Sequence, residues 1–200
     1  MKKPIGYEET PVSGEFTPVE LGGHKAVILQ VSEKQSSTGK PMLVVSFDFD
    51  KDDAQAGYFK QKFDEDDRAD KKWPNQATKY ILAEDKDGKC SKALKTFCTC
   101  VKNSNPGFDC WKGEEFDAKG IKGKKVGCVF GEEMDYYNGK EIRKRVIRFW
   151  CSIDKVADQK VPDMSETNAY KEFKESAGSS SASDGFMNIP DSIDEDLPFS

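Results

Sequence analysis

The chain has 200 residues, of which 34% are charged, and its formal net charge at pH 7 is −5. This length suits one domain with extensions or two very small domains. No run of 18 apolar residues occurs, and the opening MKKPIGYEET contains no apolar stretch typical of a signal peptide. We therefore expect a soluble, cytoplasmic protein with no membrane partner.

The acidic residues are concentrated near the end of the chain. Residues 163–200 contain nine acids and two lysines, so residues 1–162 carry a net charge of +2. We predict a domain over 1–162 and a tail over 163–200, with a short helix near 170–174 and a flexible linker at 176–183 (SAGSSSAS). Because the acid lies in a separable tail, the acidic total does not exclude a nucleic-acid partner.

Three strands are predicted in the first third of the chain. Residues 24–32 and 42–49 are rich in β-branched and aliphatic residues and flank the turn sequence SSTGKP, which predicts a hairpin with a basic tip. After an acidic loop at 50–53, residues 57–63 (GYFKQKF) alternate aromatic with polar residues. This alternation predicts a third strand.

One helix and a second hairpin follow. Residues 93–102 place Leu94, Phe97, Cys98 and Val101 at helical spacing, which predicts a helix. Residues 125–137 and 140–153 predict two strands joined by Asn-Gly, a strong hairpin signal. Three strands, a helix and a hairpin is the order of an OB-fold, a five-stranded barrel that binds oligonucleotides or oligosaccharides. An SH3-like barrel and a small α+β sandwich share the same order.

The second hairpin mixes aromatic rings with cations. Such a mixture suits single-stranded nucleic acid, because bases stack on rings while cations follow the phosphates. Strict alternation places Ile147, Phe149, Cys151 and Ile153 in the core and Lys144, Arg148 and Trp150 outside, although some rings could simply be core. The predicted nucleic-acid-binding residues are Lys34, Lys40, Tyr58, Lys60, Lys62, Lys72, Trp73, Tyr136, Tyr137, Arg143, Lys144, Arg148 and Trp150.

Signals for catalysis are weak. The acidic stretch Asp48-x-Asp50-x-Asp52 lacks the glycine and glutamate of a calcium loop, and no P-loop or dinucleotide fingerprint is present, so no cofactor is expected. A metal-dependent nuclease using Asp48 and Asp50 is an alternative to solvated turn carboxylates. Two explanations remain open for Cys90, Cys98, Cys100 and Cys110: buried thiols, or a zinc site with unusual ligand spacing.

The end of the chain resembles a known motif. Asp194, Glu195, Asp196, Leu197, Pro198 and Phe199 resemble the acidic C-terminal tip of bacterial single-stranded DNA-binding proteins, although Ser200 follows the phenylalanine here. In that family a flexible linker connects the tip to an OB-fold, and the tip binds replication, recombination and repair proteins. The resemblance implies that these six residues bind protein partners.

The body is similar to another group of proteins. The stretches KKWP, SNPGF, IKGKKVGCVFGEEMDYYNGK and VPD resemble small proteins of phage and prophage replication modules of Gram-positive bacteria. We therefore expect a non-enzymatic protein that coats single-stranded DNA without strong sequence preference and recruits partners through its tail. The alternatives are a single-strand nuclease and a protein-interaction module that binds no DNA. The sequence leaves a homo-oligomeric state open.

Overall fold

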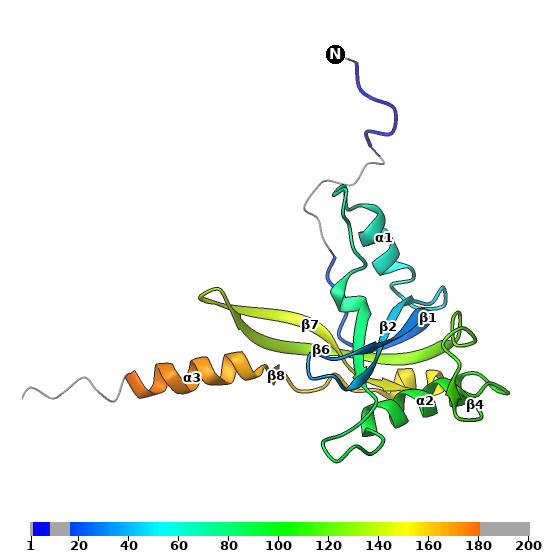
Figure 1. Cartoon of the computed structure of the whole chain (residues 1–200). Coiled ribbons are helices and arrows are strands. Elements are labelled where there is room, and N and C mark those ends of the chain that lie inside the picture. The colour runs from blue at the N-terminus through cyan, green and yellow to red at the C-terminus, as the bar shows by residue number, and fades with distance from the viewer. Residues whose placement is uncertain (1, 9–16, 181–200) are drawn as a thin grey trace, which may run out of the picture.

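The computed structural model describes residues 2–8 and 17–180, which form a mainly β structure (Figure 1). The main sheet of these residues has six strands, of which five are antiparallel in the order β3-β2-β1-β6-β7 and the sixth is a short strand that pairs with β6. The bounds of the five are β1 Gly22–Gln35, β2 Pro41–Phe49, β3 Thr78–Leu82, β6 Lys125–Tyr137 and β7 Lys140–Cys151. Both predicted hairpins are confirmed, and Asn138 and Gly139 turn the second one with φ angles of 50° and 75°.

The core lies on one face of this curved sheet. Ala26 and Ile28 of β1, Phe47 of β2 and Phe130 of β6 are each fully buried there. The predicted helix is confirmed as α2 (Lys92–Ser104), which begins where the Ser91 hydroxyl accepts a hydrogen bond from the amide of Leu94 at 3.0 Å. Its i, i+3, i+4, i+7 face adds Leu94, Phe97, Cys98 and Val101 to the same core.

The prediction of a strand at 57–63 is wrong. Tyr58–Asp64 form the helix α1, and β3 is the third strand of the sheet. The buried Asp48 carboxylate at the end of β2 fixes this helix, since it accepts hydrogen bonds from the amides of Phe59 and Lys60, both at 3.0 Å. Tyr58, Lys60 and Lys62 therefore do not share the face of a strand.

The segments after β7 lie along β6. The 3₁₀ helix η2 (Ile153–Asp158) leads to β8 (Ser165–Glu166), which pairs in parallel with β6, and then to α3 (Asn168–Ser180). In Figure 1, α3 runs beside the long β6–β7 hairpin. The Phe173 ring stacks on Tyr136 with centroids 3.9 Å apart. The predicted helix near 170–174 is confirmed, but residues 176–180 continue it, so the linker prediction is wrong for them.

Two smaller elements complete the described structure. The 3₁₀ helix η1 (Asn75–Ala77) precedes β3, and the strands β4 (Trp111–Lys112) and β5 (Glu115–Phe116) pair after α2. In Figure 1, α1 and α2 lie at opposite ends of the main sheet. Within the described residues, β3 and β7 form the two edges of this sheet and are not joined by a strand ladder.

Candidate nucleic-acid interface

A groove lies between the two edges of the sheet. Its volume is about 510 Å³. Side chains of η1 and β3 bridge it at the base: Gln76 Nε2 donates to the carbonyl of Arg145 and Lys79 Nζ donates to the carbonyl of Ile147, each at 2.9 Å. We call it the β3–β7 groove; it is lined by Asn75, Gln76, Thr78, Lys79, Tyr80, Glu133, Lys144, Arg145, Val146, Ile147 and Arg148.

Three cations of this groove face neutral oxygens. Lys79 contacts the Ile147 carbonyl, Arg145 Nη1 donates to the Val19 carbonyl, and Arg148 Nη1 donates to the carbonyls of Glu132 and Asp163. None of the three has an ion-pair partner among the residues that the structure describes. Burial lowers the pKa of Lys79, an effect that nearby Glu133 opposes and Arg148 reinforces. Uncompensated positive charge therefore gathers along the groove.

Two predicted cations are neutralised instead. Lys144 Nζ lies 2.9 Å from Asp135 and 3.3 Å from Glu133, and these contacts raise the pKa of Lys144. Arg143 pairs with Glu132 across the β6–β7 hairpin. Both residues stabilise the hairpin as cross-strand pairs, so they offer less to a phosphate than Arg148 does.

The prediction that Trp150 faces outward and Phe149 faces the core is wrong. A β-bulge opposite Val129 and Phe130 inserts Arg148 as an extra residue in β7, because Phe149 pairs with Val129 while Ile147 pairs with Phe130. The bulge reverses the alternation beyond it. Trp150 is consequently 6% exposed and packs on Phe47, whereas Phe149 is 40% exposed.

One exposed ring lines the groove. Tyr80, which lines it from β3, is 60% exposed. The exposed ring of Phe149 is not among the lining residues, because Phe149 pairs with Val129, which packs with Cys151 and Val156 apart from the main core. Exposed rings beside uncompensated cations are the combination that holds single strands in sequence-tolerant grooves. Of the predicted binding residues, Lys144 and Arg148 line this groove, and Lys62 adjoins it by donating to Gln76 at 3.3 Å.

The remaining predicted residues are dispersed. Lys60 pairs with Asp64 within α1, and the Tyr58 hydroxyl donates to the Thr17 carbonyl. Tyr136 is covered by Phe173, and Trp73 is half-buried against Phe63. The exposed ones lie at separate places: Lys72 before η1, Tyr137 at the tip of the β6–β7 hairpin, and Lys34 in β1. Lys40, at the junction of the hairpin loop and β2, is half-buried and donates to the Asp85 carbonyl.

Sequence reasoning missed three residues of the groove, Lys79, Tyr80 and Arg145, and it missed the exposure of Phe149. The stretch Thr78–Leu82 reads TKYIL, which has strand-forming residues and alternation, but it is only five residues long. The apolar residues at 57–63 fit a helix as well as a strand. Because the third strand was assigned to 57–63, the strand at Thr78–Leu82 was not predicted. The position of Phe149 depends on the bulge.

The acidic loop after β2 has structural partners. Besides the two α1 amides, Asp48 accepts from its neighbour Phe49, and burial raises the pKa of Asp48 against the effect of these three hydrogen bonds. Lys125 Nζ lies 2.9 Å from Asp50 and 3.1 Å from Asp52. In the nuclease alternative, Asp48 and Asp50 would bind the metal. In the structure, Asp48 instead caps α1 and Asp50 forms an ion pair with Lys125. Across residues 2–8 and 17–180, no cluster of three potential metal ligands occurs.

The cysteines are mostly buried thiols. Cys90 is exposed, whereas Cys98, Cys100 and Cys110 are buried. Cys98 and Cys110 lie close together, and the Cys110 thiol donates to the Cys98 carbonyl at 3.7 Å. A hydrogen bond from the Cys110 thiol lowers the pKa of Cys98, and the same contact with burial raises the pKa of Cys110. The described residues therefore favour the thiol explanation over a zinc site.

The predicted partner-binding residues 194–199 lie outside the described residues, as does the linker beyond 180. None of the described helices has the length and apolar character needed to cross a membrane. Comparison of the chain with protein-family models finds no match, and a search of curated proteins also finds no match.

Proposed function

We propose that this protein binds single-stranded DNA in the β3–β7 groove. The observation that carries the proposal is the set of three cations, Lys79, Arg145 and Arg148, that lack carboxylate partners within the described structure and lie beside the exposed ring of Tyr80. Phosphates would take the place of the missing anions, and a base would stack on the Tyr80 ring. The contacts on offer are stacking and charge, which supports binding without strong sequence preference.

The sheet order supports an OB-like barrel as the framework. In the proposed barrel, the β3 and β7 edges close around the core, with α2 filling the end between the third and fourth barrel strands. The bridges from Gln76 and Lys79 to β7 carbonyls are what support this closure. OB-folds bind single strands across such a face, between the loops that flank it.

The wider role is proposed from the sequence. A non-enzymatic, cytoplasmic protein coats the strand, and residues 194–199 recruit replication or recombination proteins. The engagement of Asp48 and Asp50 by α1 amides and Lys125 favours this role over the nuclease alternative.

An anisotropy titration with a labelled dT oligonucleotide tests the proposal. Lys79→Glu and Arg148→Glu should each weaken binding strongly, because they put an anion where a phosphate would lie. Lys122→Glu, at an exposed site between β5 and β6, changes the net charge equally and should have a much smaller effect. Equal losses in all three variants would assign binding to overall charge, and no binding at low salt would refute the function.

A further inference from the structure

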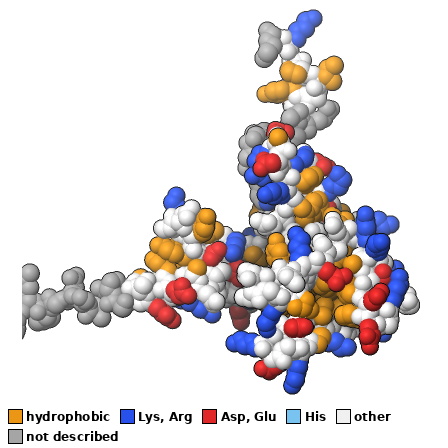
Figure 2. Space-filling model, viewed as in Figure 1, with side chains coloured by type: hydrophobic (Ala, Val, Ile, Leu, Met, Phe, Trp, Pro, Cys, Tyr) orange, Lys and Arg blue, Asp and Glu red, His pale blue; other side chains and the backbone are white. Residues whose placement is uncertain are grey.

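The segment of residues 2–8 exposes apolar side chains. Ile5 is fully exposed and Tyr7 is 62% exposed. Lys3 pairs with Glu8 and lies 4.8 Å from the centroid of the Tyr7 ring, so these contacts stay within the segment. In Figure 2, its hydrophobic and basic side chains are at the surface at the top of the picture. Two lysines next to two exposed apolar residues would suit an acidic, apolar receptor.

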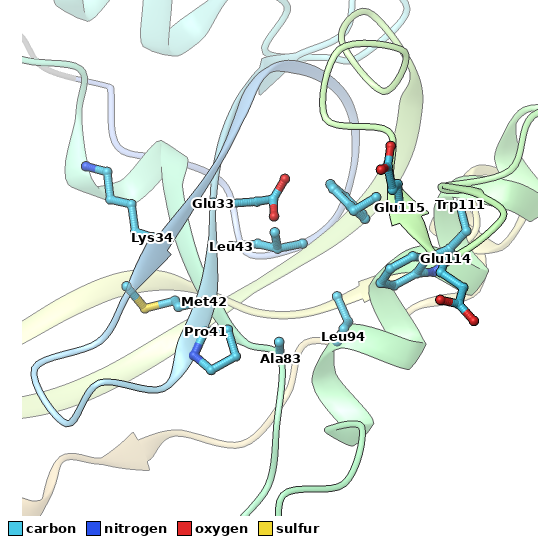
Figure 3. Close-up of a pocket in the computed structure, with 11 residues that line it drawn as sticks. Glu33, Lys34, Pro41, Met42, Leu43, Ala83, Leu94, Trp111, Glu114 and Glu115 are labelled. Carbon is cyan, nitrogen blue, oxygen red and sulfur yellow. The ribbon is translucent and has the colours of Figure 1, made fainter.

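A pocket of that character lies at the other end of the sheet. It has a volume of about 490 Å³ between the β1–β2 hairpin, α2 and the β4–β5 hairpin. Leu43, Leu94 and the 41% exposed Trp111 give it an apolar lining, and Glu33, Glu114 and Glu115 surround them (Figure 3). We call it the acidic-rim pocket.

The glutamates of this pocket are unneutralised. None of the three has an ion-pair partner in the part of the chain that the structure describes. Lys34 is the one cation among the described residues of the lining, and Figure 3 shows its side chain directed away from Glu114 and Glu115. An acidic rim disfavours DNA and the acidic tail of this chain, and it favours a cationic segment with apolar anchors.

We infer that residues 2–8 of one copy dock in the acidic-rim pocket of a second copy. Ile5 and Tyr7 would pack against Leu94 and Trp111, and Lys2 and Lys3 would face the glutamates. The Lys3–Glu8 ion pair is solvent-exposed and therefore weak enough to exchange partners. The volume of the pocket lies within the range of about 300–1,000 Å³ that is typical of ligand sites.

Distance favours a second copy over the same chain. The chain enters the fold beside α1, where the Thr17 carbonyl accepts from Tyr58, whereas the pocket adjoins the first residues of β2. The length of β2 separates these places by about 26 Å. Ten residues from Thr17 to Tyr7 span at most about 36 Å, which leaves little length to pass around the body and enter the pocket.

An arm at one end and a receptor at the other give a head-to-tail contact. Such heterologous contacts extend into chains of copies or close into rings. On a DNA strand, a chain of this kind would make binding cooperative. The contact itself does not depend on DNA, so it can be tested separately from the proposed function.

Sedimentation velocity of the full chain, without DNA and at low salt, tests the contact. We expect the sedimentation coefficient to rise with protein concentration, and deletion of residues 2–8 to remove that rise. Lys2→Glu/Lys3→Glu and Glu114→Lys/Glu115→Lys should each weaken association by about tenfold or more. Combining all four substitutions in one chain should restore it, which folding defects cannot explain.

A peptide of residues 1–10 gives a direct measure. Added to the chain that lacks residues 2–8, it should change the fluorescence of Trp111 and should have no such effect on a Trp111→Phe variant. An Ile5→Ala peptide should bind about tenfold more weakly or worse. A monomer at every concentration, association that survives the deletion, or a peptide that leaves Trp111 unchanged would overturn the inference. Unaltered DNA binding by the deleted chain would leave the proposed function standing.

Discussion

Replacement of Tyr80 by alanine separates binding from folding. The ring is 60% exposed on an edge strand, opposite Val44, so its loss should change the free energy of unfolding by no more than about 1 kcal/mol. As a stacking platform, the same ring should contribute about 1–3 kcal/mol to single-strand binding. That free energy corresponds to a loss of affinity of about 5- to 150-fold. Anisotropy with a labelled dT oligonucleotide and a thermal melt of the same protein measure the two quantities.

Two further variants make the test specific. Tyr80→Phe keeps the ring and should bind almost as well as the unmodified protein. Tyr137→Ala removes a ring that is 64% exposed at the tip of the β6–β7 hairpin, outside the groove, and should also bind well. If Tyr80→Ala binds normally while Tyr137→Ala does not, the DNA follows the hairpin arm and the groove assignment is wrong.

Three other predictions concern the core, the groove charge and the tail. Trp150→Ala should lower stability by about 3–5 kcal/mol, seen as a large drop in melting temperature, because the ring is 6% exposed; an unchanged melt would contradict the bulged register. Arg148→Ala should flatten the dependence of log K on log salt by about 0.7, whereas Arg143→Ala, which removes a paired cation, should change it less. Phe199→Ala should abolish most retrieval of host replication proteins in a pull-down while leaving DNA binding intact; identical retrieval would refute the tail's role.

The fold could be predicted wherever local signals were sufficient. Both hairpins and α2 follow from alternation, from Asn138-Gly139 and from a four-residue helical face. The helix α1 could not be predicted in this way. Its seven residues fit either period, and the deciding group is the Asp48 carboxylate, which lies eleven positions before Phe59 in the sequence. The hydrophobic periodicity left helix and strand equally possible for these residues, and a tertiary hydrogen bond selects the helix.

The candidate site was harder to predict than the fold for the same reason. Composition marked the basic and aromatic character of β7, which does supply Arg148 and Lys144 to the groove. Which ring faces outward depends on one inserted residue, and strict alternation cannot reveal a bulge. The partner strand β3 brings Lys79 and Tyr80 from a distant part of the chain, and only its pairing with β2 places them opposite β7.

The buried pair of His24 and Asp53 makes stability depend on pH near neutrality. His24 Nδ1 lies 3.0 Å from Asp53 Oδ1, and its Nε2 lies 3.0 Å from the Glu20 carbonyl. Burial alone would lower the pKa of His24, but these two hydrogen bonds raise it above its ordinary value of 6.5. Burial alone would raise the pKa of Asp53. The hydrogen bonds from His24 and from two backbone amides outweigh burial and lower this pKa below its ordinary value of 3.8.

The sign of the effect follows from the two directions. The contribution of His24 to the free energy of unfolding is complete below pH 6.5, and it is lost as the pH rises through the raised pKa of folded His24. The contribution of Asp53 to the free energy of unfolding is complete above pH 3.8, and it is lost as the pH falls through the lowered pKa of folded Asp53. The pair therefore stabilises the fold most between these values, and the melting temperature should fall as the pH is raised above 6.5. Because His24 is the single histidine of the chain, its ring signals in NMR report the titration directly. Asp53→Asn should return the His24 pKa to its ordinary value or below and should remove most of this slope, and a melting temperature that is flat from weakly acidic to weakly alkaline pH would show that the pair contributes nothing.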